Sequence, residues 1–194
     1  MDIFAHSVWA AIAAKKYNDT NGKKISFGST QDKPSRRKIS IGWSAFWGVF
    51  PDLFAFGLPF LVLLFLVISG DLPLQPMWPG SAVVADHAPW IAGFIPFAYQ
   101  ISHSIVVFAG VFLLSWIIMQ RLPIVLLGWA LHIAIDIFSH AATFYPTPFL
   151  WPISDWKFLY GISWADPRYM IINYAAMLVC FWLVFLRKKS NSNE

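Results

Sequence analysis

Four long apolar runs alternate with polar segments along the chain. A helix needs roughly 20 predominantly apolar residues to cross the hydrocarbon core of a bilayer, and each run is long enough to do so. The pattern therefore predicts four membrane helices, at residues 39–69, 97–119, 123–144 and 169–187.

The N-terminal segment follows a different pattern. Residues 1–14 are apolar but too short to span a membrane, and the lysines follow the apolar stretch instead of preceding it as in a signal peptide. We predict a short helix that lies in the membrane surface or dips into it. Residues 17–38 are polar and contain Asn-Gly and Lys-Pro pairs, which favour a loop.

Two further segments, residues 70–96 and 143–168, are rich in proline and tryptophan. Tryptophan prefers the membrane–water interface, so we expect re-entrant or cap-like loops packed on the outer ends of the helices. The predicted fold class is all-α: a polytopic membrane helix bundle of about four transmembrane helices, with the short N-terminal helix and these outer loops. Residues 1–194 form a single integral membrane domain.

Composition supports this prediction. Of the 194 residues, 58% are hydrophobic and only 12% are charged, which is too little charge to cover a water-facing surface. A soluble globular protein is therefore excluded, and so is a disordered chain. The single cysteine, Cys180, excludes an internal disulfide framework and a cysteine-rich zinc or iron–sulfur site.

The net charge is +4, and the basic residues are unevenly distributed. Twelve of the 14 lie before the first run, between the second and third, or at and after the end of the fourth. Short loops rich in lysine and arginine stay cytoplasmic, so we predict a multi-pass protein of the plasma (inner) membrane with both termini in the cytoplasm. This distribution indicates topology, and we expect no nucleic-acid partner.

Ionisable residues inside the apolar runs are the candidates for chemistry: Asp52, His103, His132, Asp136 and His140. Such residues are costly in the hydrocarbon and rare. His132, Asp136 and His140 are spaced i, i+4, i+8, which places them on nearly one stripe of a helix. A set of nitrogen and oxygen donors without cysteine suits a divalent metal, most often zinc, with manganese or iron as alternatives.

Other interpretations remain open at this point. A histidine in a membrane helix often forms an interhelical hydrogen bond, and a His/Asp stripe also suits a proton relay in a transporter. Asp52 follows Pro51, so it is equally consistent with a helix cap. His6 alone fits a buried polar contact, and His87 fits an ordinary loop histidine.

Several short motifs together resemble the membrane-bound metal-dependent hydrolases of the YdjM/YbcI type, which are similar to zinc-dependent phospholipase C and the zinc-dependent single-strand nucleases. The motifs occur in the family's order and span most of the chain. They read DIFAHSVWA, GVFPDLFAF, ISHSIVV, LHIAIDIFSH and TPFLWPIS.

The resemblance implies a mainly helical bundle that hydrolyses an ester, expected to be a phosphoester. It also implies a set of metal ligands or catalytic residues: His6, Asp52, His103, His132 and Asp136. The family usually has a second aspartate where this chain has Phe54, and an arginine upstream of the His-Ser pair that this chain lacks. His140 or Asp155 is therefore a candidate replacement ligand.

The expected mechanism is a metal-activated water, with Asp52 or Asp136 as the general base if it is not a ligand. Lys157 and Arg168 are the only cations predicted on the outer side, and they could hold an anionic headgroup, although Lys157 also suits an interfacial position. The expected substrate is a membrane lipid or a lipid-linked small molecule. A small proton- or ion-coupled transporter and an inactive metal-binding scaffold are the rival functions.

Overall fold

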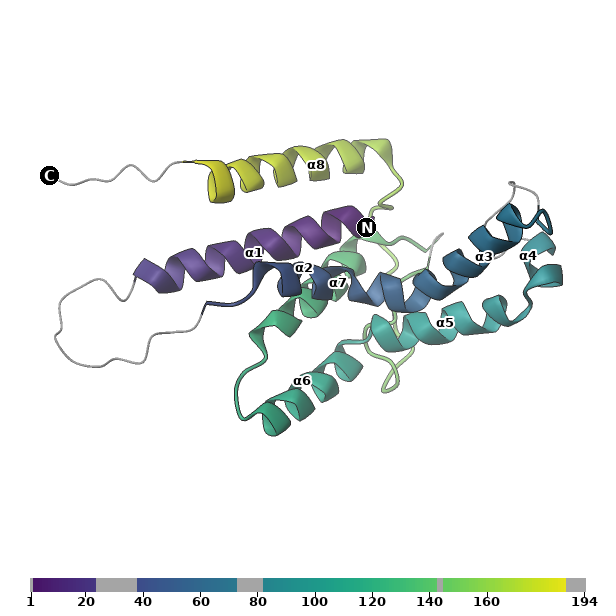
Figure 1. The fold of residues 1–194 in the computed structure, drawn as a ribbon, viewed down its shortest axis with the longest axis horizontal. Coiled ribbons are helices and arrows are strands. Elements are labelled where there is room, and N and C mark those ends of the chain that lie inside the picture. The colour runs from purple at the N-terminus through teal and green to yellow at the C-terminus, as the bar shows by residue number, and fades with distance from the viewer. Residues whose placement is uncertain (1, 24–37, 73–81, 143–144, 188–194) are drawn as a thin grey trace, which may run out of the picture.

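The computed structural model describes residues 2–23, 38–72, 82–142 and 145–187. Within these ranges the chain is helical, and the only extended pairing is an isolated antiparallel bridge between Ala141 and Tyr160 (Figure 1). The all-α prediction is confirmed for this part of the chain.

The N-terminal helix α1 spans Ile3–Lys23 and is longer than predicted. At its start, the Asp2 carboxylate accepts a hydrogen bond from the Ala5 backbone N–H at 2.9 Å. Near its end, Asn18 donates to the backbone oxygen of Ile39 and accepts from its N–H, both at 2.9 Å. These two hydrogen bonds stabilise the end of α1, so the first part of the predicted loop 17–38 is helical. Residues 24–37 of that loop lie outside the described ranges.

The first predicted membrane helix is present and nearly continuous. Helix α2 (Ile41–Asp52) leads through the π-helical segment η1 (Leu53–Gly57) into α3 (Leu58–Ile68). Together they form 28 residues that are long and apolar enough to cross a membrane. Ser40 begins α2 by accepting a hydrogen bond from the Trp43 backbone N–H.

The second predicted helix is broken in two. Helices α5 (Trp90–Ser102) and α6 (Ile105–Met119) meet at a bend of 60°. Ser104 causes the break, because its Oγ caps α6 by accepting from two backbone N–H groups. The same hydroxyl donates to the Trp151 backbone oxygen, which ties the bend to a distant part of the chain.

The last two predicted helices differ in length. Helix α7 covers only Leu127–Ser139, after a single 3₁₀ turn, η2, at Ile124–Leu126, and the chain becomes extended at His140. Helix α8 (Pro167–Phe181) continues through the π-helical segment η3 (Trp182–Leu186) for 20 residues. In the described ranges, two helices are long enough to span a membrane, or three if the bent pair is one span. Ile124–Ser139, in the third predicted run, is a shorter apolar helix, so the predicted count of four spans is not confirmed.

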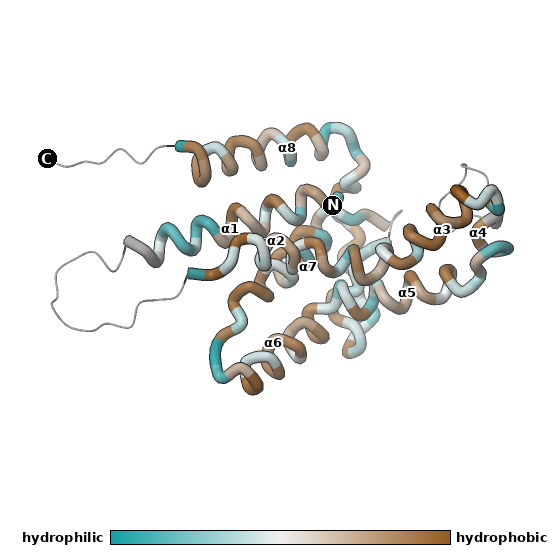
Figure 2. The backbone as a smooth tube through the Cα atoms, viewed as in Figure 1, coloured by the Kyte–Doolittle hydropathy of each residue, from teal (hydrophilic) through white to brown (hydrophobic). Residues whose placement is uncertain are grey.

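Many apolar side chains on these helices point outward. Ile68, Ile118 and Ile171 are each at least 70% exposed. Hydrophobic residues recur along most of the helices (Figure 2). Such exposure is expected of helices that face lipid. It supports an integral membrane location.

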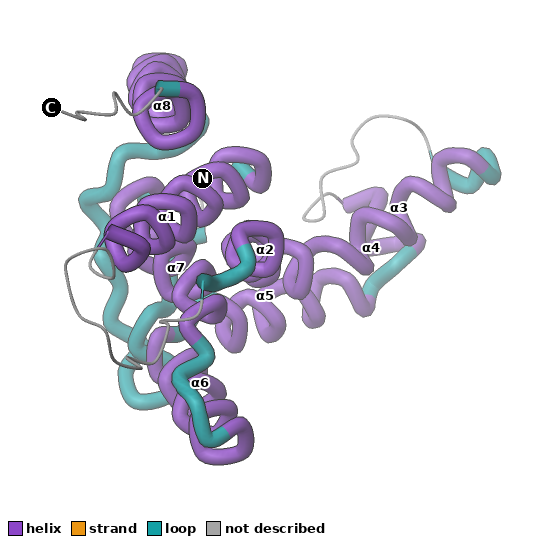
Figure 3. The backbone as a smooth tube through the Cα atoms, turned by 60° about the vertical axis from the view of Figure 1, so that its left-hand side comes forward, coloured by secondary structure: helices purple, strands orange, loops and turns teal. Residues whose placement is uncertain are grey.

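Close packing of α1, α2 and α7 forms the centre of the molecule (Figure 3). A Cβ atom added at Gly48 would lie 2.6 Å from the Ala10 Cβ, and one added at Gly128 would overlap the backbone oxygen of Ser44. Only glycine allows this close approach of the three backbones. Helix α8 joins them through a hydrogen bond from Trp9 Nε1 to Asn173 Oδ1 at 3.0 Å.

The described part of the second Pro/Trp-rich segment, residues 145–166, packs as a cap across two helix ends. The Ile105 backbone N–H donates to Phe149, and the Trp164 N–H donates to Ser139 at the end of α7. In the first such segment, a short helix α4 covers Ala82–His87 and α5 begins at Trp90. Its residues 73–81 lie outside the described ranges.

Candidate metal centre

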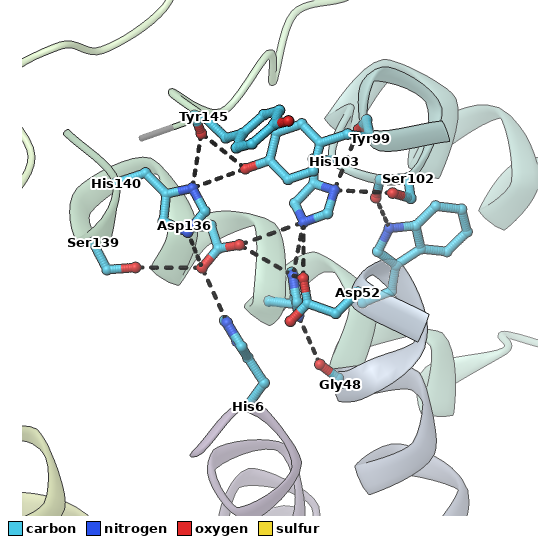
Figure 4. Close-up of polar contacts among 12 residues, drawn as sticks. His6, Gly48, Asp52, Tyr99, Ser102, His103, Asp136, Ser139, His140 and Tyr145 are labelled. Atoms are coloured by element: carbon cyan, nitrogen blue, oxygen red, sulfur yellow. Dashed lines mark hydrogen bonds and ion pairs between the residues drawn. The ribbon is translucent and has the colours of Figure 1, made fainter. Parts of the chain in front are cut away.

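Four buried side chains converge near the middle of the bundle: Asp52, His103, His132 and Asp136 (Figure 4). Each offers one potential ligand atom, and these four atoms lie within 4.8 Å of one another. They come from the end of α2, the break between α5 and α6, and α7. Three separate parts of the fold therefore build one centre.

Local structure explains how each residue reaches it. His132 and Asp136 lie one turn apart on the same face of α7, as their spacing predicted. His103 occupies the break, with φ −105° and ψ 15°, outside the regular helix. Asp52 lies at the junction of α2 and η1 and makes no side-chain capping hydrogen bond there, which argues against the helix-cap interpretation.

The imidazole rings and the carboxylates face each other directly. Oδ2 of Asp136 lies 3.1 Å from His132 Nε2 and 3.4 Å from His103 Nε2. Oδ1 of Asp52 lies farther away, at 3.7 Å and 3.5 Å from the same two nitrogens. The two Nε2 atoms are themselves 3.1 Å apart.

Backbone oxygens hold the outer nitrogens of both rings. His132 Nδ1 lies 2.7 Å from the Gly48 oxygen, and His103 Nδ1 lies 3.2 Å from the Tyr99 oxygen and 2.9 Å from Ser102 Oγ. A carbonyl oxygen can only accept, so Nδ1 must carry the hydrogen in each contact. In the neutral tautomer the lone pair of Nε2 then points into the centre. Histidines that bind metals are oriented in this way.

Neutral rings in this tautomer would place two ring lone pairs and two carboxylates around one point. These groups repel one another unless a cation or protons lie among them. A divalent cation could accept electron pairs from all four groups and so offset their repulsion. Nitrogen and oxygen atoms of this kind are common ligands of such ions. This group could therefore hold a divalent metal, whose identity the donor set does not fix.

The second oxygen of Asp136 faces two more histidines that the sequence also singled out. Oδ1 lies 3.0 Å from His6 Nε2 and 3.6 Å from His140 Nε2. The His6 ring stacks on His132 with centroids 3.7 Å apart. All six predicted metal residues thus gather around Asp136, with His6 and His140 outside the group of four.

The two predicted headgroup residues are not part of this cluster. Arg168 is exposed at the start of α8, and Lys157 is half-buried in the capping segment. Neither forms an ion pair with a described carboxylate of the centre. His87 is exposed on α4.

Sequence reasoning missed the residues that hold the rings in place. Tyr99 stacks on His103 with centroids 3.8 Å apart, and its hydroxyl lies 2.8 Å from His140 Nδ1 and 3.0 Å from the Tyr145 oxygen. Its position four residues before His103 was the available signal. Gly48 contributes only its backbone oxygen, which no residue pattern marks.

Comparisons with protein-family models, with curated proteins and with solved structures found no match to this chain.

Proposed function

We propose that this protein is a membrane-embedded, metal-dependent hydrolase that cleaves a phosphoester of a lipid or a lipid-linked substrate. One observation carries the proposal: two carboxylates and two backbone-held imidazoles from three parts of the fold face a common buried centre. The resemblance of the sequence motifs to the YdjM/YbcI-type hydrolases supports the same reaction class. The assignment of the chain to that family is part of the proposal.

A bound divalent metal would lower the pKa of a water molecule and polarise the ester. In the protein, His103, His132 and Asp136 are the proposed ligands, because each is at most 1% exposed. His6 and His140 fix the orientation of Asp136 through its second oxygen.

Asp52 is the proposed general base. It is the most exposed of the four residues, at 7%, and its carboxylate lies farthest from the rings. A group in this position can take a proton from a water molecule at the centre, while Asp136 remains held by histidines on both oxygens. The two carboxylates therefore receive different roles.

Zinc is the proposed metal, because imidazole and carboxylate donors are typical of catalytic zinc sites. The proposed substrate is a lipid or lipid-linked compound, since the centre lies within helices whose outer faces are apolar. The proposed location is the plasma (inner) membrane, with both chain ends cytoplasmic by positive-inside counting. The end of α1, the start of α2 and the end of α8 lie on one side in Figure 1, which supports that orientation.

Hydrolysis of lipid-linked phosphoesters by the purified, metal-loaded protein tests this proposal. Turnover should fall by at least 100-fold in His132→Ala and stay unchanged in the matched surface variant His87→Ala. If the wild-type protein retains its metal but hydrolyses none of the phosphoesters, an inactive metal-binding scaffold would be favoured. Ion flux into proteoliposomes that disappears in Asp136→Asn would favour a transporter.

A further inference from the structure

A half-open apolar groove lies between α1, the start of α2 and α7, at the opposite end of these helices from the capping segment. Small residues line much of it, and larger apolar side chains complete the wall: Ala10, Ala13, Ala14, Gly128, Ile124 and Leu131. Its volume is about 240 Å³. An apolar cavity of roughly 150 Å³ is enough to hold a benzene ring, so several methylene groups fit here.

The groove is separate from the metal centre. Between the two, Gly48 packs so closely on Ala10 that an added Cβ would lie 2.6 Å from the alanine Cβ. A Cβ added at Gly128 would lie 3.0 Å from the Gly48 backbone nitrogen. None of the four residues of the metal centre lines the groove, so the groove needs its own explanation, independent of the proposed hydrolysis.

An apolar occupant suits this groove better than water. A hollow lined by alkyl groups loses dispersion contacts when it is empty, and a water molecule needs two or more polar partners to be held. One of the few polar side chains in the lining, Ser44, already donates its hydroxyl hydrogen to the Ser40 backbone oxygen at 2.9 Å. A hydrocarbon chain fills such a space without leaving polar groups unsatisfied.

Three exposed cations are close in sequence to residues that line the groove. Lys16 is adjacent to Tyr17 and Lys38 is adjacent to Ile39, both lining residues, and Asn18 binds Ile39 to α1. Arg121 is exposed three residues before Ile124 in the wall. The Asp19 carboxylate, on the same stretch of α1, pairs with Lys15 at 2.7 Å. The rim therefore keeps an excess of positive charge beside an apolar hollow.

We propose that this groove binds an acyl chain of an anionic phospholipid, whose phosphate is held by Lys16, Lys38 and Arg121. Basic pockets between membrane helices are suited to such headgroups, because the negative phosphate is attracted to Lys and Arg side chains. The apolar wall of the groove contacts the acyl chain. The combination of an apolar groove with a cationic rim selects an anionic lipid over a zwitterionic one.

Native mass spectrometry of the detergent-solubilised full chain tests the proposal, with added phosphatidylglycerol or phosphatidylcholine of identical acyl chains as the probes. We expect one tightly retained phosphatidylglycerol and at least tenfold weaker phosphatidylcholine binding. Ala13→Trp fills the groove from an exposed position and should abolish retention, and the milder Ala13→Leu should weaken it. Lys16→Gln with Lys38→Gln should lower phosphatidylglycerol affinity roughly tenfold, whereas the charge-conserving pair Lys16→Arg with Lys38→Arg should leave it close to that of the wild type.

Equal retention of phosphatidylglycerol and phosphatidylcholine would overturn the proposed preference for an anionic lipid. Unchanged phosphatidylglycerol retention in Ala13→Trp and in Ala13→Leu, with a thermal midpoint like that of the wild type, would overturn the groove as the site. Loss on lysine replacement with no effect of either Ala13 variant would also overturn it, since the lipid would then bind to surface charge alone.

Discussion

His6 Nε2, in the first helix, lies 3.0 Å from Oδ1 of Asp136 in α7. Both side chains are buried, and the His6 ring also stacks on His132. This contact places the N-terminal helix at the candidate metal centre, next to an aspartate whose other oxygen faces His103 and His132. Helix α1 is therefore part of the site, and its docking and the integrity of the centre should change together.

Replacing His6 with alanine should weaken metal binding and loosen α1. Removing a residue that orients a ligand typically costs 10–100-fold in metal affinity. We expect a loss in this range, measured by competition with a chelating dye, together with a lower thermal midpoint. The control is His87→Ala on α4, where the same substitution at an exposed position should leave both quantities unchanged. An equal effect of the two variants would contradict the assignment of His6.

Gly48→Ala should be strongly destabilising. The new Cβ would lie 2.6 Å from the Ala10 Cβ and 2.8 Å from the His6 backbone oxygen, so α1 and α2 would have to separate. Overpacking of this kind costs about 1–3 kcal/mol. The separation would also move the Gly48 oxygen that holds His132, so metal affinity should fall too.

The matched control for that variant is Gly93→Ala on α5, which would place its Cβ in open space. Alanine is favoured over glycine in a helix by about 1 kcal/mol, so this variant should be neutral or slightly stabilising. Thermal unfolding in detergent measures both changes. A Gly48→Ala midpoint at or above that of Gly93→Ala would show that the close packing of α1 and α2 is wrong.

Tyr99→Phe and Tyr99→Ala should separate two roles of this side chain. Phenylalanine keeps the ring that stacks on His103 but removes the hydroxyl that contacts His140, so we expect a drop in metal affinity of a few fold. Alanine removes both and leaves a cavity, so the loss should be at least tenfold. Tyr160→Phe, at an 88% exposed position, is the control and should have no effect. Equal affinities of the two Tyr99 variants would contradict the stacking role.

The two aspartates should respond differently to replacement by asparagine. Asp136→Asn removes the charge that faces four histidines, so the purified protein should lose its metal. Asp52→Asn should keep most of the metal and lose at least 100-fold in turnover, because it removes the proposed base. Metal content and initial rates on one phosphoester measure this difference. The reverse pattern, with metal lost only in Asp52→Asn, would exchange the two roles.

The sequence predicted the parts of this site that depend on local spacing. His132 and Asp136 share a face of α7 because residues four apart lie close together on any helix. The proline before Asp52 indicated an irregularity in the first run, and the structure has a π-helical segment directly after that aspartate. The signal was a polar residue within an apolar run in the first case and a proline in the second.

The rest depended on contacts between distant residues. The Asn18 clamp on Ile39 extends α1 beyond its apolar part, and the hydroxyl of Ser104 breaks the second run into two helices. Both side chains bond backbone groups that no hydropathy pattern identifies. Only the resemblance implied that His6 lies at the metal centre, because its position there depends on the packing of α1 against Gly48.

The metal content of the full-length protein, purified in detergent without chelators and measured by inductively coupled plasma mass spectrometry, tests the central claim most directly. We expect about one tightly bound divalent ion per chain or more, and its loss in a His103→Ala/His132→Ala variant that retains its helical circular dichroism. No metal above the level of that variant, even after incubation with zinc, manganese or iron, would contradict the assignment of this centre.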